Sequence, residues 1–144
     1  MTFQLGATLG RCRYAEVPAC EPSIAPPGTS TFTALDVYQI KRRDILDFGV
    51  DFAPWMAGNG NPSLSGATWA VASGSPKTPI IESQSHTADG KTVAIIKPAN
   101  DAVKGDTYYV EITATFAAVP ASEGQPSIAA RTLVRRIHII VVEG

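Results

Sequence analysis

The densest group of carboxylates in this sequence is formed by Asp44, Asp47 and Asp51. Paired carboxylates can share a metal ion or divide the acid and base roles of glycoside hydrolysis. In an extended strand, Asp47 and Asp51 share a face but lie roughly 13 Å apart at ~3.3 Å per residue. That distance is too wide for one metal ion or for a retaining glycosidase pair. We expect both aspartates to be structural, either pairing with the basic run at 41–43 or capping backbone amides.

The two histidines, His86 and His138, form no catalytic constellation with other residue types. His86 lies beside an expected hairpin turn, where a solvated turn residue is the simplest interpretation. His138 alternates with buried positions and is expected to be a face residue of a strand. The sequence has no Gly-x-Ser-x-Gly elbow, no phosphate-binding loop and no metal-binding histidine pair.

Cys12 and Cys20 lie in an irregular segment, at a spacing that matches no common zinc motif. We expect two free thiols, because disulfides are rare in cytosolic products, although the spacing leaves a disulfide geometrically open. No nucleophile lies next to a base. We therefore expect no enzymatic activity, no cofactor and no metal site.

The two tryptophans allow a carbohydrate-binding interpretation, because an exposed aromatic ring can stack on a pyranose. Trp69 alternates with Val71 as a core residue does, comparable to the buried tryptophan of immunoglobulin strand C, so we expect it to be structural. Trp55 lies at the mouth of a loop and is the candidate platform, provided that it is exposed to solvent. The aromatic content of 8% and the lack of a second aromatic nearby on an exposed strand face argue against this function.

Length and composition limit the possible functions of the chain. Its 144 residues are 44% hydrophobic and 17% charged, as expected for one globular domain. The formal charge of −1 argues against a nucleic-acid binder, even though Arg131, Arg135 and Arg136 are close in sequence. No apolar run approaches the ~20 residues of a membrane helix. Residues 1–6 do not have the pattern of a secretory signal, so a cytosolic origin is expected.

Seven stretches have the composition and the period of two that are typical of β-strands. They span residues 35–40, 45–52, 68–72, 79–85, 92–97, 107–118 and 130–142. Pro54 is expected to end the second strand, and residues 55–58 to form a single turn. Asp89-Gly90 is expected to be a hairpin turn. Many short strands without a convincing helix indicate an all-β sandwich.

The clearest local signal is the segment 103–113, where a tight turn containing Gly105 leads into a long strand. From Tyr108 to Ile112, every second residue is apolar, which is typical of a half-buried strand. The corner before strand F of immunoglobulin-like sandwiches has this pattern, and there the tyrosine hydroxyl bonds back to the backbone. We therefore expect an immunoglobulin-like β-sandwich in which Gly105 and Tyr108 are structural.

The first 34 residues differ from the rest of the chain. Their prolines break any regular element, yet they hold more apolar side chains than a purely entropic linker would. We expect an extended arm at 1–34 and a sandwich at 35–144 whose core closes without the arm. The last strand is apolar at its end on both faces, so the arm or a partner subunit is expected to cover it. The expected contact residues are Phe3, Leu5 and Tyr14 in the arm, Trp55 in its loop, and Ile140 and Val142 in the last strand.

Residues 41–56, followed by the Thr-Trp-x-Val pattern at 67–71, resemble small structural proteins of tailed bacteriophages. In that family a charged start leads to Leu-Asp-aromatic and Asp-aromatic pairs, then to a tryptophan and a Gly-rich loop. The segments 105–115 and 131–139 are similar too, so that the resemblance covers about residues 41–142. Phe52 stands where tryptophan is usual, and residues 58–62 replace a more usual Gly-Asp turn.

This resemblance implies a fiber–tail adaptor or virion-accessory protein with an immunoglobulin-like sandwich. Such a protein joins fibers or accessory proteins to the tail or neck, without catalysis, and contacts other virion proteins as a symmetric homo-oligomer. It would be made in the bacterial host cytoplasm and reside in the virion, with no nucleic-acid or membrane partner. A capsid decoration (cement) protein is the close alternative, and a carbohydrate-binding module is the alternative from another class. Position in the particle and copy number stay open.

Overall fold

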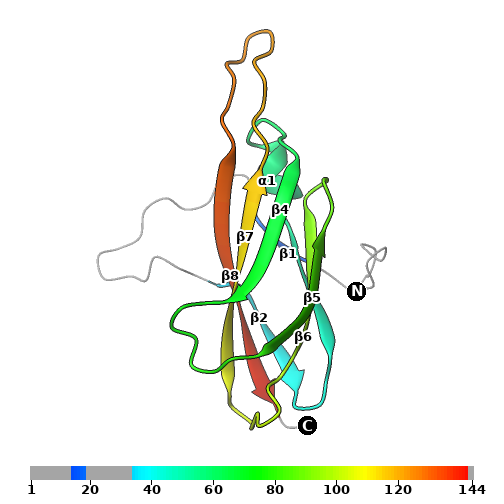
Figure 1. The fold of residues 1–144 in the computed structure, drawn as a ribbon. Helices are drawn as coiled ribbons and strands as arrows, with labels where there is room; N and C mark the ends of the chain where they lie inside the picture. Colours follow the sequence, from blue (N-terminus) through cyan, green and yellow to red (C-terminus); the bar gives the residue numbers. More distant parts are fainter. Residues whose placement is uncertain (1–13, 19–33, 143–144) are drawn as a thin grey trace, which may run out of the picture.

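The computed structural model describes residues 14–18 and 34–142. These residues form two packed β-sheets and one short helix (Figure 1). The elements, in chain order, are β1 (Ala15–Glu16), β2 (Ala34–Lys41), β3 (Leu46–Asp51), α1 (Ala53–Ala57), β4 (Leu64–Val71), β5 (Ile80–His86), β6 (Lys91–Lys97), β7 (Thr107–Phe116) and β8 (Arg131–Val142).

One sheet has the strand order β1-β3-β6-β5, and the other has the order β2-β8-β7-β4. The predicted all-β sandwich is therefore confirmed. All seven expected strands are present, although β4 begins at Leu64 rather than at residue 68. The turn expected at 55–58 is the helix α1, which has Pro54 in its first turn, where a missing backbone N–H does no harm.

Most neighbouring strands run antiparallel, but two pairs are parallel. β2 runs parallel to β8, with Tyr38 opposite Ile139, and the two-residue β1 runs parallel to β3. The longest ladder joins β7 and β8, from Thr107 opposite Ile140 to Phe116 opposite Arg131. These two strands carry the chain to the end of the sandwich where the hairpin described below begins.

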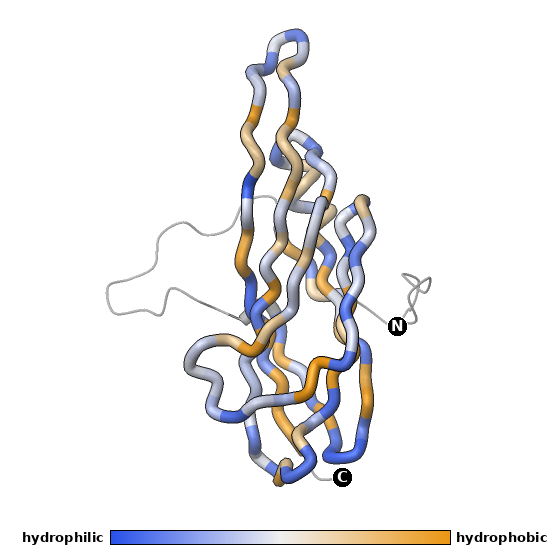
Figure 2. The backbone as a smooth tube through the Cα atoms, viewed as in Figure 1, coloured by the Kyte–Doolittle hydropathy of each residue, from blue (hydrophilic) through white to orange (hydrophobic). Residues whose placement is uncertain are grey.

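The core lies between the sheets and follows the alternation seen in the sequence. The inward residues of the central strands are buried: Phe48, Val50, Ala94, Ile96, Val110, Ile112, Ile137 and Ile139. Figure 2 shows hydrophobic positions alternating with hydrophilic ones along the strands. Burying a side chain of this size stabilises the fold by about 1.5–3 kcal/mol. Within the described residues, no helix is long and apolar enough to cross a membrane.

Trp69 is a core residue, as predicted, with 2% of its surface exposed. Its indole N–H donates a hydrogen bond of 2.8 Å to the hydroxyl of Thr92, a buried polar residue on the facing sheet. The Thr92 hydroxyl donates in turn to the Ser85 carbonyl at 2.8 Å. The ring therefore fills the core while its polar atom is satisfied, which avoids the cost of a buried unpaired donor.

The Gln84 side chain connects the two sheets where their edge strands β5 and β4 face each other. The sequence did not predict this contact. Its amide oxygen accepts from the Trp69 backbone N–H at 2.7 Å, and its amide nitrogen donates to the Trp69 carbonyl at 3.2 Å. One side chain thus occupies the two backbone groups of Trp69 that a further strand could use to pair with β4. This protects an edge that would otherwise be open to pairing with another chain.

The tyrosine corner expected from the sequence is present. The Tyr108 hydroxyl accepts a hydrogen bond of 3.2 Å from the Ala99 backbone N–H, nine residues upstream. Burial raises the pKa of this hydroxyl, which stays protonated. Gly105 has a φ of 96°, a left-handed conformation that favours glycine, and its N–H donates to the Val141 carbonyl at 2.8 Å.

The predicted boundary between an arm at 1–34 and a sandwich at 35–144 is wrong for residues 14–18, the part of the arm that the structure describes. Val17 is fully buried, Ala15 is 5% exposed, and the Val17 N–H donates to the Asp51 carbonyl at 3.0 Å. Residues 14–18 therefore belong to the sandwich, and Tyr14 is partly buried beside β3. The two alternating apolar residues before Pro18 are too few to be distinguished from irregular chain by pattern alone. Phe3, Leu5, Cys12 and Cys20 lie outside the described residues.

Candidate interaction site at the hairpin end

Three connections meet at one end of the sandwich (Figure 1). They are the β3–β4 connection with α1 (residues 52–63), the β5–β6 turn (87–90) and the β7–β8 connection (117–130). Backbone hydrogen bonds tie them together: Phe52 N–H to the Gly90 carbonyl at 2.8 Å, Leu64 N–H to Ala88 at 3.1 Å, and Ala117 N–H to Ser63 at 3.0 Å. Residues far apart in sequence therefore form one connected surface.

The β7–β8 connection is a hairpin that projects beyond the rest of the molecule (Figure 1). We call residues 117–130 the projecting hairpin. Its two arms are joined by the bridges Val119–Ile128 and Ser122–Gln125. Gly124 turns the chain at the tip with a φ of 79°. The sequence indicated a loop here, but not that the arms stay paired beyond the sheet.

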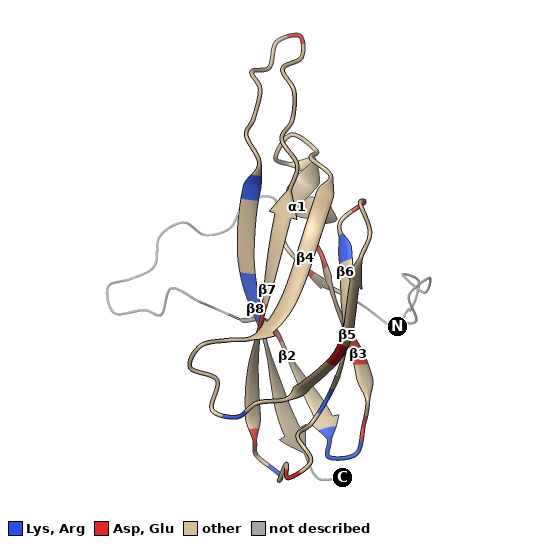
Figure 3. Cartoon of the chain, in the orientation of Figure 1, with Lys and Arg blue, Asp and Glu red and all other residues tan. Residues whose placement is uncertain are grey.

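The outer part of the projecting hairpin has small, uncharged side chains. Residues 120–127 are all exposed, and Glu123 at the tip is the one charged residue between 117 and 130 (Figure 3). Figure 1 shows no other described segment alongside this part. Small side chains allow another protein to approach the backbone closely, and the outer edges of a two-stranded ribbon offer unpaired N–H and carbonyl groups.

Arg131 fixes the base of the projecting hairpin to the β3–β4 connection. Its Nη2 donates a hydrogen bond of 2.7 Å to the Asn59 carbonyl, and its guanidinium carbon lies 4.9 Å from the centre of the Trp55 ring. The Asn59 side chain donates in turn to the Trp55 carbonyl at 2.7 Å. A cation–π contact of this kind contributes about 0.5–2 kcal/mol.

Trp55 is not the exposed platform that a sugar-binding module requires. It is only 8% exposed, and its ring centre lies 4.7 Å from that of Phe116, which contacts Phe52 in turn at 5.6 Å. The neighbouring Pro54 and Gly58 suggested a loop, whereas the helix α1 directs Trp55 inward. The prediction that Trp55 contacts a partner is therefore wrong. Trp55 instead supports the base of the hairpin through its contact with Arg131.

Two glycines show how closely these connections pack. A Cβ at Gly60 would lie 2.9 Å from Cδ1 of Ile128, in the hairpin base. A Cβ at Gly90 would lie 2.6 Å from Sδ of Met56 and 3.0 Å from the Ala53 nitrogen. Both glycines have positive φ values, 90° and 108°. The hairpin base and the β5–β6 turn are therefore each held in contact with the β3–β4 connection.

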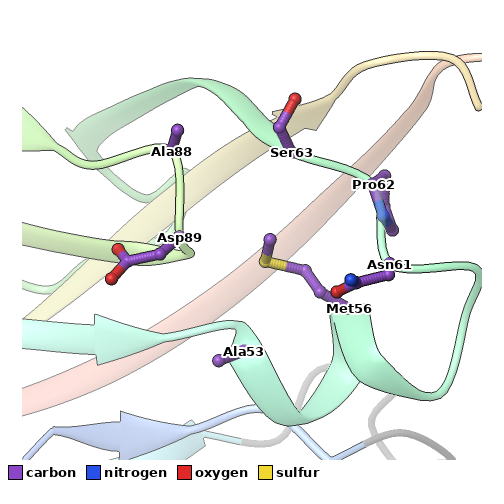
Figure 4. Close-up of a pocket in the computed structure, with 7 residues that line it drawn as sticks. All are labelled: Ala53, Met56, Asn61, Pro62, Ser63, Ala88 and Asp89. Atoms are coloured by element: carbon purple, nitrogen blue, oxygen red, sulfur yellow. The ribbon is translucent and has the colours of Figure 1, made fainter.

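A cavity of about 300 Å³ lies between α1 and the β5–β6 turn (Figure 4). It is lined by Ala53, Met56, Asn61, Pro62, Ser63, Ala88 and Asp89. In Figure 4 the Asp89 carboxylate and the Ser63 hydroxyl point away from Met56. A hydrogen bond from the Thr87 hydroxyl, with the nearby Lys91 ammonium, lowers the pKa of Asp89. This carboxylate is engaged by its own turn, which leaves the Asn61 amide, directed toward Met56 in Figure 4, as a single polar side chain rather than a convergent set that would orient a ligand.

The expectation for the aspartates is confirmed at Asp51, whose carboxylate accepts a hydrogen bond of 2.9 Å from the Ala53 backbone N–H. Asp47 is partly buried and lies opposite Ile95 in the β3–β6 pair. Within residues 14–18 and 34–142, no three His, Cys, Asp or Glu residues are grouped so that they could hold a metal ion. Ile140 and Val142 are partly buried on the outer face of β8, beside Gln39 and Lys41 of β2.

The arginines near the C-terminus do not form one patch. Arg131 holds the hairpin base, while Arg136 pairs with Glu111 on a neighbouring strand. His86 is exposed at the end of β5, as expected for a turn residue. No protein-family model, no curated protein and no solved structure matches the chain. The resemblance to phage structural proteins therefore stays a prediction.

Proposed function

We propose that this chain is a non-catalytic structural adaptor of a tailed-bacteriophage virion, and that the projecting hairpin holds its partner protein. The observation that carries the proposal is the contrast within residues 117–131. The base of the hairpin is anchored by Arg131 and by contacts with Gly60, whereas residues 120–127 are exposed. A binding element of this form loses little conformational freedom when it docks, because its direction is set beforehand.

The virion part of the proposal rests on the sequence resemblance over residues 41–142. The strand order supports the immunoglobulin-like form that this family implies. Immunoglobulin sandwiches place strands B, E and D in one sheet and C, F and G in the other. The orders β3-β6-β5 and β8-β7-β4 are compatible with this arrangement, and Tyr108 lies at the start of β7, the strand that would correspond to F. Sandwiches of this type serve many functions, so the fold supports the assignment without carrying it.

The test replaces residues 120–127 with Asn-Gly, a two-residue turn that suits a type I′ hairpin and keeps the Val119–Ile128 bridge. The shortened protein is expected to melt at the wild-type temperature. When it is supplied in place of the natural protein, particles should lack the partner, as measured by mass spectrometry of purified virions. Particles with a normal protein content would contradict the role of the hairpin.

Wild-type protein labelled with gold and viewed by electron microscopy tests the location. Label at the tail or neck supports the adaptor, whereas label over the capsid surface would favour the decoration alternative. Absence from purified particles would contradict the virion assignment altogether. The carbohydrate-binding alternative loses its supporting residue, since Trp55 is buried.

A further inference from the structure

Most backbone N–H groups of the projecting hairpin between residues 119 and 128 are either used within the hairpin or missing. Across one bridge, Val119 and Ile128 each donate a hydrogen bond to the carbonyl of the other, at 2.8 and 2.9 Å. Ser122 and Gln125 do the same at the tip, at 3.1 and 2.9 Å. These N–H groups point from one arm to the other, so they are not open to a partner protein.

Proline removes a further N–H group from each arm. Pro120 lies between the two bridges in the first arm, and Pro126 lies between them in the second. Ala121 and Ser127 are the other residues there, so each arm offers at most one outward N–H group between the bridges. A strand that adds to a ribbon needs such groups at every second residue along one edge. Beyond the Val119–Ile128 bridge, this ribbon is therefore unsuited to strand addition, because proline on an edge prevents it.

The side chains of the same part form an exposed surface that is uncharged except at one position. Pro120, Ala121 and Pro126 present apolar surface on both arms, and Glu123 at the tip carries the one charge. Covering apolar surface stabilises a complex by about 25 cal/mol per Å² removed from water. Covering a carboxylate without a partner is costly, so a protein that encloses the tip must supply a cation.

We infer that residues 120–127 enter a recess of the partner protein, which contacts both arms of the hairpin at once. The walls of the recess are apolar where they meet Pro120 and Pro126, and a lysine or arginine receives Glu123. The missing N–H groups disfavour an added strand, and the exposure of both arms leaves their side chains open to the partner. This inference rests on the proposed function and specifies the surface that the partner presents.

The first test measures whether both arms are covered in the particle. Ala121→Cys and Ser127→Cys place one thiol on each arm, and each variant reacts with a maleimide reagent, free in solution and in purified virions. Both thiols should react at least about tenfold more slowly in the virion, because a covered thiol reacts only when the complex opens. The matched control is Thr78→Cys, at an exposed residue of the β4–β5 connection, which should keep its rate. Wild-type protein gives the background from Cys12 and Cys20.

The pattern of labelling separates this inference from the proposed function. Slow labelling of one arm alone would show a contact along one edge; the recess would then be wrong, while the binding role of the hairpin would stand. Rapid labelling of both arms in the virion would contradict the recess and the binding role together. Slow labelling of both arms already in the isolated protein, with a mass above the monomer in sedimentation equilibrium, would show that a second copy of this chain provides the cover, and would overturn the partner recess.

The second test restores the missing donors. Pro120→Thr combined with Pro126→Thr returns an N–H group to each arm and removes both rings. Virions should then hold at least about tenfold less of the protein that is lost with the shortened hairpin, because the apolar contacts of both rings are gone. Pro76→Thr, at an exposed proline of the β4–β5 connection, is the control. An undiminished content of that protein would overturn the recess, since restored donors favour an added strand. If the double variant loosens the hairpin, the labelling of the two thiols decides.

The third test concerns the charge at the tip. Glu123→Lys should reduce the content of the partner in the virion more than Glu123→Gln does, because it brings two cations together where the carboxylate met one. Asp101→Lys, at an exposed carboxylate of the opposite end, is the control and should leave the content unchanged. Equal contents for Glu123→Lys and Glu123→Gln would show that no cation receives Glu123.

Discussion

The two ends of the sandwich are both tied by hydrogen bonds, yet they present different surfaces. At the hairpin end, a segment of mostly small side chains with one charged residue, Glu123, extends beyond the sheets. At the opposite end, the connections at 42–45 and 98–106 are short and carry charges of both signs (Figure 3). There the Tyr108 hydroxyl and the Val141–Asp106 and Gly105–Val141 backbone bonds close the fold. At the end opposite the hairpin, short connections complete the sandwich. At the hairpin end, a connection extends away from the sandwich.

The difference shows that rigidity alone does not identify a binding site in this molecule. The tyrosine corner is as well bonded as the hairpin base, but its neighbours Lys104 and Asp106 are polar and at the surface of a closed turn. The projecting hairpin combines an anchored base with an exposed outer part in which Glu123 is the one charged residue. Variants at the shared core and at each end should therefore have separable effects.

The largest effect is expected from Trp69→Ala, which removes a core residue common to both ends. It should lower the free energy of unfolding by about 3–5 kcal/mol, a large part of the ~5–15 kcal/mol typical of a domain. Urea denaturation measures this loss. Trp55→Ala should also destabilise, because Trp55 is buried against Phe116, but its loss should be accompanied by loosening of the hairpin. A small, equal loss at both positions would show that neither ring supports the core.

A smaller effect is expected from Tyr108→Phe, at the end of the sandwich opposite the hairpin, which we call the closed end. It leaves the Ala99 N–H without the acceptor seen at 3.2 Å, which should cost about 1–3 kcal/mol if that donor stays dry. Partner binding should be unchanged, because the hairpin is at the other end. A variant that keeps its stability but loses the partner would contradict the division between the two ends.

At the hairpin end, Arg131→Leu removes the hydrogen bond to Asn59 and the contact with Trp55. We expect a loss of only about 0.5–2 kcal/mol in stability. The amides of Val119 and Ile128, which pair within the hairpin, should exchange with solvent distinctly faster. Hydrogen exchange followed by NMR measures this, with Arg42→Leu in the exposed turn of the opposite end as the control. Equal protection in both variants would show that Arg131 does not brace the hairpin.

The smallest effect is the pH dependence contributed by His138. Its pKa is lowered in the folded protein from the usual 6.5 by burial and by Arg136, so the unfolded chain takes up the proton more readily. This contribution to stability is complete above pH 6.5 and decreases as the pH falls through and below that value. Because the ring is partly exposed, the decrease should be modest. Urea titrations of the wild type and of His138→Phe should diverge as the pH falls; parallel curves would contradict the assignment.

The local pattern of the sequence was sufficient to predict the strands and the tyrosine corner at the closed end. Alternation over 107–118 and 130–142 predicted β7 and β8, and the Gly105–Tyr108 pattern predicted a bond from the tyrosine hydroxyl back to the backbone, which the structure shows at Ala99. Trp69 was placed in the core for the same reason, since a strand with a period of two has a defined inner face. Features whose partners lie within a few residues, or that repeat along one strand, could be predicted.

Only the tertiary structure decided how distant segments use their side chains. Trp55 is buried because Phe116 and Arg131, more than sixty positions later in the chain, meet α1, and Val17 is buried because β3 lies beside it. The hairpin projects because the two arms of the β7–β8 connection stay paired, through the Val119–Ile128 and Ser122–Gln125 bridges, beyond the other strands. A side chain's own sequence neighbours set which way it faces, but contact with remote residues sets whether it is covered. For that reason the sequence determined the strands and the tyrosine corner, and the packing of remote segments determined the anchored hairpin and the burial of Trp55 and Val17.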